Sequence, residues 1–191
     1  MAYKLLIMVD VQKDFDKGGA LPYGYPEESN TDAVIKYATD WIKDQPSGNP
    51  KKLLCVTKDT HNENYANTLE GKLLPVPHCI KDTVGWELVD EGDYKYSLSE
   101  RADWLVLKKT FGTFAIADEI RRIEKDECEE VEEITLIGYD LSICVLAQAV
   151  ILRAAFPNKR ITVHKDLCGD VNKESFDAAL TVLKNQQIEI V

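Results

Sequence analysis

The chain has 191 residues, of which 45% are hydrophobic and 29% are charged, as in an ordinary soluble domain. Its 33 acidic and 23 basic residues give a formal net charge of −10, which disfavours nucleic-acid phosphates and anionic membrane surfaces as partners. No run approaches the roughly 18 apolar residues of a membrane span, and the first residues lack the pattern of a secretory signal. We therefore expect a cytoplasmic protein that binds neither nucleic acid nor membrane.

Six short apolar runs predict strands that are buried on both faces, because their apolar residues are continuous rather than alternating. In chain order these runs are 5–9, 53–57, 104–107, 134–137, 161–164 and 188–191. Amphipathic spacing predicts helices over 32–44, 116–125, 143–154 and 173–184, the last with Asn172 as its N-cap. Strands that alternate with helices predict right-handed crossovers. The expected fold is one three-layer α/β domain over 1–191, with a mostly parallel six-stranded sheet of Rossmann type and helices on both faces.

Charged residues come directly or shortly after four of these runs, namely Asp10, Asp59, Lys108, Lys109 and Asp140. In an open parallel sheet, ligands bind beyond the carboxyl ends of the strands, where the strand order reverses. We therefore expect the functional site at this edge of the sheet. Two long segments without clear periodicity, 18–29 and 61–99, are predicted to be functional loops.

Five cysteines are scattered without a C-x-x-C pair, which argues against a disulfide framework or a cysteine-rich zinc module. Most are expected to be buried apolar side chains. Cys144 differs because it lies at the start of a predicted helix, where the helix dipole lowers the pKa of a thiol and free amides can stabilise an oxyanion. Asp10 is then a candidate proton acceptor, stabilised by Lys108 or Lys109. The alternative is that Cys144 is simply a core residue.

A second group of polar residues lies in and after the run 53–57. Asp59 and His61 are two residues apart and so share one face of an extended segment. Glu70 and His78 follow in the same irregular segment. Imidazole with carboxylate suits Zn²⁺, Fe²⁺ or Mn²⁺, whereas the simpler interpretation is scattered surface side chains. The third histidine, His164, falls within a predicted strand and is expected to be a satisfied core residue.

Three segments resemble motifs of the isochorismatase-like cysteine hydrolases, and within them the nicotinamidase-related branch. Segment 9–15, VDVQKDF, resembles the opening D-x-Q-x-D-F motif of that family. Segment 108–113, KKTFGT, resembles the K-x-T-F-G-[ST] block. Segment 138–145, GYDLSICV, resembles the nucleophile turn G-x-x-T-D-x-C-V, with Leu141 and Ser142 in place of the usual Thr-Asp pair.

The resemblance implies a catalytic triad of Asp10, Lys108 and Cys144, which selects Lys108 over Lys109. It also implies a cis peptide between Tyr139 and Asp140, and an oxyanion hole made by the backbone amides of Asp140 and Cys144. Because Leu141 and Ser142 depart from the motif, the polar contacts that normally brace the turn are expected to differ.

The resemblance further implies a divalent metal that holds the ring nitrogen of a pyridine substrate. Zinc is expected first, with iron or manganese as alternatives. Phe15 and Trp86 are candidates for aromatic walls around the ring, with core packing as the alternative for each. The implied metal ligands are Asp59, His61, Glu70 and His78, and Glu70 is the least certain of them because other family members carry histidine there.

The expected function is therefore hydrolysis of a small aromatic carboxamide, first of all nicotinamide to nicotinate and ammonia, through a thioester on Cys144. Such a reaction would belong to pyridine nucleotide salvage, and the resemblance implies a homo-oligomer. One alternative is a metal-free hydrolase of N-carbamoyl or ureido compounds, and another is an isochorismatase-type hydrolase, which cleaves a vinyl ether without a cysteine nucleophile. A third alternative is a non-catalytic paralogue that binds a small molecule.

Overall fold

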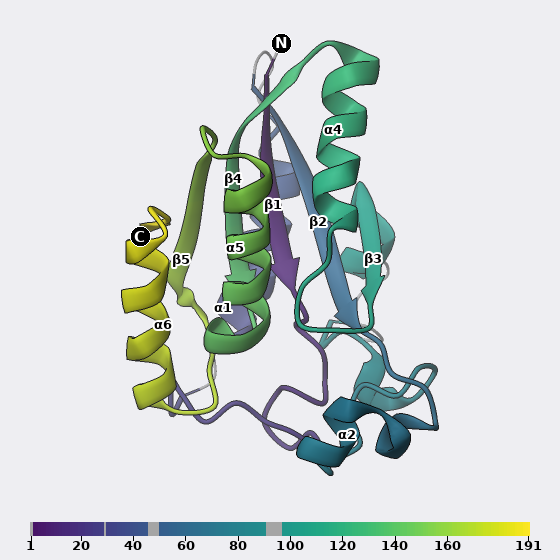
Figure 1. The fold of residues 1–191 in the computed structure, drawn as a ribbon. Helices are drawn as coiled ribbons and strands as arrows, with labels where there is room; N and C mark the ends of the chain where they lie inside the picture. Colours follow the sequence, from purple (N-terminus) through teal and green to yellow (C-terminus); the bar gives the residue numbers. More distant parts are fainter. Residues whose placement is uncertain (1, 29, 46–49, 91–96) are drawn as a thin grey trace.

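The computed structural model describes residues 2–28, 30–45, 50–90 and 97–191, and the described strands form one six-stranded parallel sheet. Its strand order is β3-β2-β1-β4-β5-β6 (Figure 1). The predicted α/β fold class is thereby confirmed. The strands are β1 (Ala2–Val9), β2 (Lys51–Asp59), β3 (Trp104–Lys108), β4 (Glu130–Gly138), β5 (Arg160–Cys168) and β6 (Glu189–Ile190).

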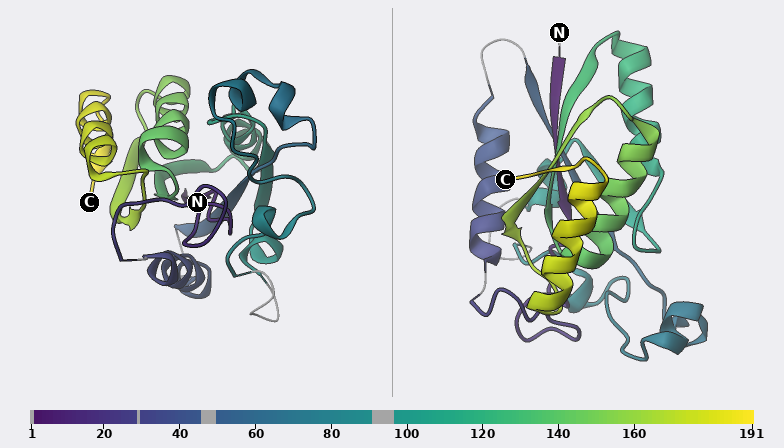
Figure 2. Two further views of the ribbon diagram at one scale, coloured as in Figure 1. Left: turned by 90° about the horizontal axis from the view of Figure 1, so that it is seen from below. Right: turned by 60° about the vertical axis from the view of Figure 1, so that its left-hand side comes forward.

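Helices cover both faces of the sheet, as the sequence predicts. Helix α1 (Thr31–Lys43) lies on one face, and α4 (Ala115–Glu127), α5 (Leu146–Ala155) and α6 (Lys173–Asn185) lie on the other (Figures 1 and 2). The side chains of β1 alternate between the two layers: Leu5 packs in the cluster formed with α4, α5 and α6, whereas Leu6 packs in the cluster with α1. This central strand is therefore continuously apolar.

The nucleophile turn and the long segment 61–99 differ from the sequence-based expectation. The helix predicted from residue 143 begins instead as a π-helical turn, Leu141–Val145, and continues as α5. Segment 61–99 carries short helices rather than being wholly irregular, although its residues 91–96, like residue 29 of the first predicted loop, lie outside the described residues. Its elements are the 3-10 turns Tyr65–Asn67 and Val84–Trp86, and the helices α2 (Leu69–Leu73) and α3 (Leu98–Arg101).

Two predictions of burial are wrong. Strand β3 lies at an edge of the sheet and, within the described part of the chain, pairs only with β2, so Leu105 and Leu107 are each 44% exposed instead of buried. His164 on β5 is only partly buried, and its Nδ1 has no hydrogen-bond partner among the described residues. The cysteine prediction is confirmed, because all five are free and four of them are buried, with Cys128 exposed.

The strand order reverses between β1 and β4, which are neighbours in the sheet although β2 and β3 separate them in sequence. Their carboxyl ends point toward the same edge as α2 and its flanking loops, at the bottom of Figure 1. A ligand site is expected at this reversal. No helix in the described part of the chain is long and apolar enough to cross a membrane.

Candidate active site

Asp10 lies just beyond the end of β1, where the chain turns with a positive φ of 51°. Aspartate tolerates this left-handed conformation better than most residues. Thr57 of the neighbouring strand β2 donates its hydroxyl to Asp10 Oδ1 at 2.7 Å. The Asp10 carboxylate is completely buried and thus has a fixed orientation.

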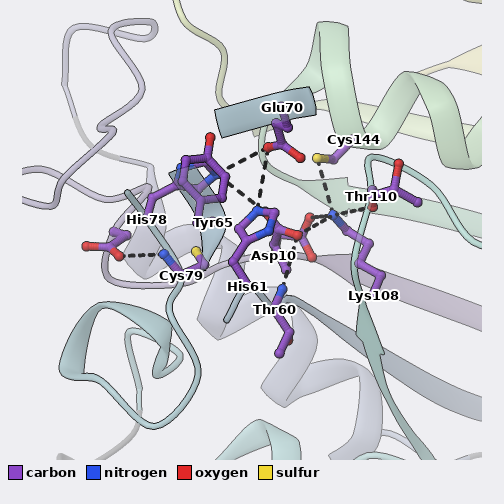
Figure 3. Close-up of polar contacts among 12 residues, drawn as sticks. Asp10, Thr60, His61, Tyr65, Glu70, His78, Cys79, Lys108, Thr110 and Cys144 are labelled. Carbon is purple, nitrogen blue, oxygen red and sulfur yellow. Dashed lines mark hydrogen bonds and ion pairs between the residues drawn. The ribbon is translucent and has the colours of Figure 1, made fainter. Parts of the chain in front are cut away.

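Lys108, the last residue of β3, connects the functional groups of the site (Figure 3). Its Nζ lies 2.6 Å from Asp10 Oδ2 and 3.4 Å from the Cys144 sulfur, and it donates to the Thr110 carbonyl at 3.1 Å. Lys108 is buried, whereas Lys109 is exposed. The tertiary structure thus places Lys108, and not its neighbour, beside Asp10 and Cys144.

Cys144 lies in the π-helical turn that follows β4, directly before α5. Burial raises the pKa of its thiol well above the ordinary value, and the nearby Lys108 ammonium only partly opposes this effect. The direction of this shift is opposite to the lowering expected from the helix start, because desolvation outweighs the Lys108 charge. A resting thiol needs a nearby proton acceptor before its sulfur can act as a nucleophile.

Asp10 and Lys108 respond to burial in opposite ways. Burial raises the pKa of Asp10, and the Lys108 charge partly offsets this. For Lys108, burial alone would lower the pKa, but the neighbouring Asp10 and Cys144 raise it above the ordinary value. Lys108 is therefore a permanent cation, and Asp10 is a carboxylate with increased basicity, as a general base requires.

The nucleophile turn is braced by Asp170, a residue that the sequence analysis did not single out. Its carboxylate accepts the Ser142 backbone N–H at 2.7 Å, the Ser142 hydroxyl at 2.8 Å and the Val171 N–H at 2.7 Å. Asp170 is itself fixed by backbone pairing with Tyr25. These contacts brace a turn that lacks the family's usual Thr-Asp pair. No local pattern marks Asp170, because it follows β5 and reaches the turn only through the fold.

The peptide between Tyr139 and Asp140 is cis, as the family resemblance implies. The Asp140 carbonyl accepts the N–H groups of Ile143 at 3.2 Å and Val145 at 3.0 Å. Its side chain is buried, and Oδ1 has no hydrogen-bond partner among the described residues. Burial, with the nearby Asp170 and Asp10 carboxylates, raises the pKa of Asp140 to about 7.

The four predicted metal ligands come together next to the triad, and one ligand atom of each lies within 4.8 Å of the others. His61 Nε2 is 3.0 Å from Asp59 Oδ2 and 3.5 Å from Glu70 Oε1. His78 Nε2 is 3.5 Å from Asp59 Oδ2 and 3.7 Å from Glu70 Oε1. Lys108 Nζ lies 3.6 Å from Asp59 Oδ1, so it joins this cluster to the triad.

Local backbone structure explains how residues far apart in sequence reach the cluster. A parallel bridge pairs His61 with Ile80 and brings His78 beside it. Thr68 caps α2 by accepting the Gly71 N–H at 3.0 Å, which places Glu70 in the first turn of that helix.

Gln12 of the opening motif fixes the backbone of Asp59. Its side-chain oxygen accepts the Asp59 N–H at 2.7 Å, and its Nε2 donates to the Asp59 carbonyl at 2.9 Å. The sequence analysis quoted Gln12 within the motif but gave it no role. The available signal was its place in the opening motif, two residues after Asp10.

The chemistry of this cluster fits a divalent cation. His78 directs Nδ1 to the Val76 carbonyl at 2.8 Å, so this nitrogen carries a proton and Nε2 faces the carboxylates. A fixed tautomer of this kind is typical of metal-ligating histidines. Although burial would raise the pKa of Asp59, hydrogen bonds from His61 and His78 bring it below its usual value, so the carboxylate is ionised. Two imidazoles with two carboxylates suit zinc, iron or manganese.

Of the two predicted aromatic walls, Phe15 lies beside this cluster, whereas the described side-chain contacts of Trp86 are with Thr60 and Lys58. The Phe15 ring is buried, with its centroid 5.5 Å from that of His78. Trp86 donates its indole N–H to the Thr60 hydroxyl at 2.9 Å, and the Lys58 ammonium lies 3.5 Å from its ring centroid. These contacts do not bring the Trp86 ring to the cluster, and its role as an aromatic wall stays a prediction.

A family model, the isochorismatase domain, matches residues 4–191. Among solved structures, the nicotinamidase/pyrazinamidase of Bacillus subtilis is 25% identical, with 100% of each chain covered and a TM-score of 0.78. The pyrazinamidase/nicotinamidase of Streptococcus mutans is 26% identical, with 98% and 99% covered and a TM-score of 0.77. The pyrazinamidase of Pyrococcus horikoshii in complex with zinc is 25% identical, with 98% of each chain covered and a TM-score of 0.73. No match was found among curated proteins.

Proposed function

The chain belongs to the isochorismatase family, and from this membership and the geometry of its site we propose that it hydrolyses a small aromatic carboxamide, with nicotinamide as the first candidate. The observation that carries the proposal is the position of Lys108. Its ammonium contacts both Asp10 and the Cys144 sulfur and also faces Asp59 of the metal-ligand cluster. Lys108 therefore lies next to the proposed nucleophile Cys144, the proposed base Asp10 and the proposed metal-ligand cluster.

In the first half of the reaction, Asp10 accepts the Cys144 thiol proton and the sulfur attacks the amide carbonyl carbon. The backbone N–H groups of Asp140 and Cys144 stabilise the resulting oxyanion. Asp10 then returns the proton to the amide nitrogen, the C–N bond breaks and ammonia leaves. Lys108 stabilises the carboxylate and the thiolate at the stages when each carries negative charge.

In the second half, Asp10 removes a proton from a water molecule, whose oxygen attacks the thioester carbonyl. The C–S bond breaks, the sulfur recovers a proton through Asp10, and the carboxylic acid is released. Asp59, His61, Glu70 and His78 would hold a divalent metal, which supplies a Lewis acid for the ring nitrogen of the substrate. The buried position of Asp10 and Cys144 limits access of bulk water to the thioester.

Ammonia release from nicotinamide by the purified protein tests this proposal, before and after chelation and with zinc, iron or manganese added back. We expect release that depends on metal and disappears in Cys144→Ala. The matched control is Cys128→Ala, which changes an exposed free cysteine and should leave turnover intact. Release that persists in Cys144→Ala would contradict the mechanism. A metal-independent activity on ureido compounds alone would instead identify a carbamoyl hydrolase.

A further inference from the structure

A groove beside the catalytic cluster is larger and more apolar than a single-ring amide requires. Its volume is about 530 Å³, and it lies between α2 and the beginning of α5. Glu70 is the only charged residue in its described lining. The apolar part of the lining is formed by Leu73, Leu74, Phe111, Ile143, Leu146 and Ala147.

The groove is continuous with the site rather than remote from it. Glu70 lines the groove at one end and approaches His61 and His78 within the metal-ligand cluster. Ser142 and Ile143 of the nucleophile turn also line the groove. Figure 3 draws Glu70 together with His61, His78 and Cys144, the residues whose neighbourhood the groove adjoins. A substrate whose ring lies at the cluster therefore has its neighbouring atoms at the mouth of the groove.

Apolar side chains are left facing water at this mouth. Leu73 is 78% exposed and Phe111 is 47% exposed. Apolar surface of this kind gains free energy when an apolar ligand covers it, by about 25 cal/mol per Å². Asp10 is completely buried and Cys144 nearly so, and the groove adjoins Cys144 through the neighbouring Ser142 and Ile143.

We infer that the groove is a substrate subsite, and that the protein accepts aromatic carboxamides with an aliphatic substituent of several carbons on the ring. This inference rests on the proposed function and specifies its substrate class. The ring lies at the metal-ligand cluster and the carboxamide faces Cys144, while the substituent passes Glu70 and packs against Leu73, Phe111 and Leu146. The substituent carries no charge, since Glu70 is the only charged group in the described lining.

Binding of an alkyl series tests the subsite independently of turnover. Zinc-supplemented Cys144→Ala protein is titrated by calorimetry with nicotinamide and with derivatives carrying methyl, propyl or pentyl at ring position 5 or 6. We expect the Kd to fall by about fourfold for each added methylene in one of the two series, the amount that burial of a methylene provides. A Kd that stays constant or rises with chain length in both series, or binding of no compound, would overturn the inference.

A pair of leucines on α2 provides matched variants. Leu73 lines the groove, whereas Leu69, on the same helix and 74% exposed, lines the adjoining hollow beside His61 but is absent from the groove's described lining. The two hollows share Glu70, Leu73 and Phe111. Leu73→Ser should reduce the ratio of pentyl to unsubstituted affinity about tenfold, and Leu69→Ser should leave this ratio unchanged. Equal effects of the two substitutions would contradict the assignment. The assignment would also be contradicted if the Kd did not change with chain length and Leu73→Ser converted an oligomer to a monomer. That result would identify the groove as a contact between copies of the chain.

The proposed function and the subsite can fail separately. Wild-type protein that hydrolyses nicotinamide, while Cys144→Ala shows no gain with chain length, keeps the function and excludes the subsite. Tighter binding of longer derivatives, with no hydrolysis of any of them by the wild type, keeps the subsite and excludes the amidase.

Discussion

Asp170 accepts two hydrogen bonds from Ser142, one from its backbone N–H at 2.7 Å and one from its hydroxyl at 2.8 Å. Ser142 stands two residues before Cys144, so the carboxylate of a loop after β5 fixes the turn that carries the proposed nucleophile. Asp170 is completely buried, and its orientation is therefore determined by these donors and by backbone pairing.

Asp170→Ala should lower both activity and stability. The substitution leaves the Ser142 N–H without its acceptor, which costs about 1–3 kcal/mol for a buried group. A displaced nucleophile should reduce kcat by about 100-fold. Ser142→Ala keeps the backbone hydrogen bond and should cause a smaller loss. Chemical denaturation and amide hydrolysis measure the two effects.

The control for this prediction is Asp166→Ala, which removes an exposed acid near the same strand end. It should change neither kcat nor the free energy of unfolding appreciably. If Asp170→Ala retained full kcat, the brace would have no part in positioning Cys144.

Lys108→Met should be strongly destabilising as well as inactive. It leaves the buried Asp10 carboxylate without its counter-charge, and breaking a buried ion pair in this way costs about 3–5 kcal/mol. Lys109→Met is the matched control, because the neighbouring lysine is exposed and its removal should have little effect. Thermal unfolding and ammonia release are measured on both variants. If Lys109→Met were the inactive variant, Lys109 rather than Lys108 would be the lysine of the site.

Asp140 should make stability depend on pH. Its pKa rises from 3.8 to about 7 in the folded protein, because of burial and the Asp170 and Asp10 charges. The folded state therefore holds this proton more tightly than the unfolded chain does. Its contribution to stability is present below about pH 4 and is lost as the pH rises to about 7, by about 4 kcal/mol at most.

Asp140→Asn removes this titration. The free energy of unfolding of the variant, relative to wild type, should increase between pH 4 and pH 7 and stay constant above that range. Urea denaturation at a series of pH values measures this difference, with Asp166→Asn as a control at an exposed acid. A difference that is independent of pH would show that Asp140 has an ordinary pKa.

Zinc should raise the melting temperature of the wild-type protein, because an ion that binds only the folded state stabilises it by mass action. His61→Ala and His78→Ala should abolish this increase, and Glu70→Gln should weaken zinc affinity. His164→Ala is the matched control, since it is the third histidine of the chain and lies outside the cluster. A zinc response that survives in His61→Ala, or one that disappears in His164→Ala, would place the ion elsewhere.

The sequence by itself determined the strands and the main helices, and it indicated the residues of the candidate site. Continuous apolar runs and helical spacing are local properties, so they predicted the parallel sheet and helices on both faces without knowledge of any long-range contact. The motifs around Asp10, Lys108 and Cys144 indicated the family in the same way. The pattern could not show that β3 is an edge strand, because exposure of Leu105 depends on which strands pair.

The tertiary structure alone decided which side chains meet. The family motif favours Lys108 although the doubled lysine leaves its register open, and the pairing of β3 with β2 decides the matter by burying Lys108 beside Asp10. The same holds for the brace from Asp170, which no local pattern marks. The Cys144 thiol is a further example, because burial by the assembled fold raises its pKa and outweighs the nearby Lys108 charge. Local periodicity determines elements, whereas distances and desolvation between distant residues are properties of the assembled core.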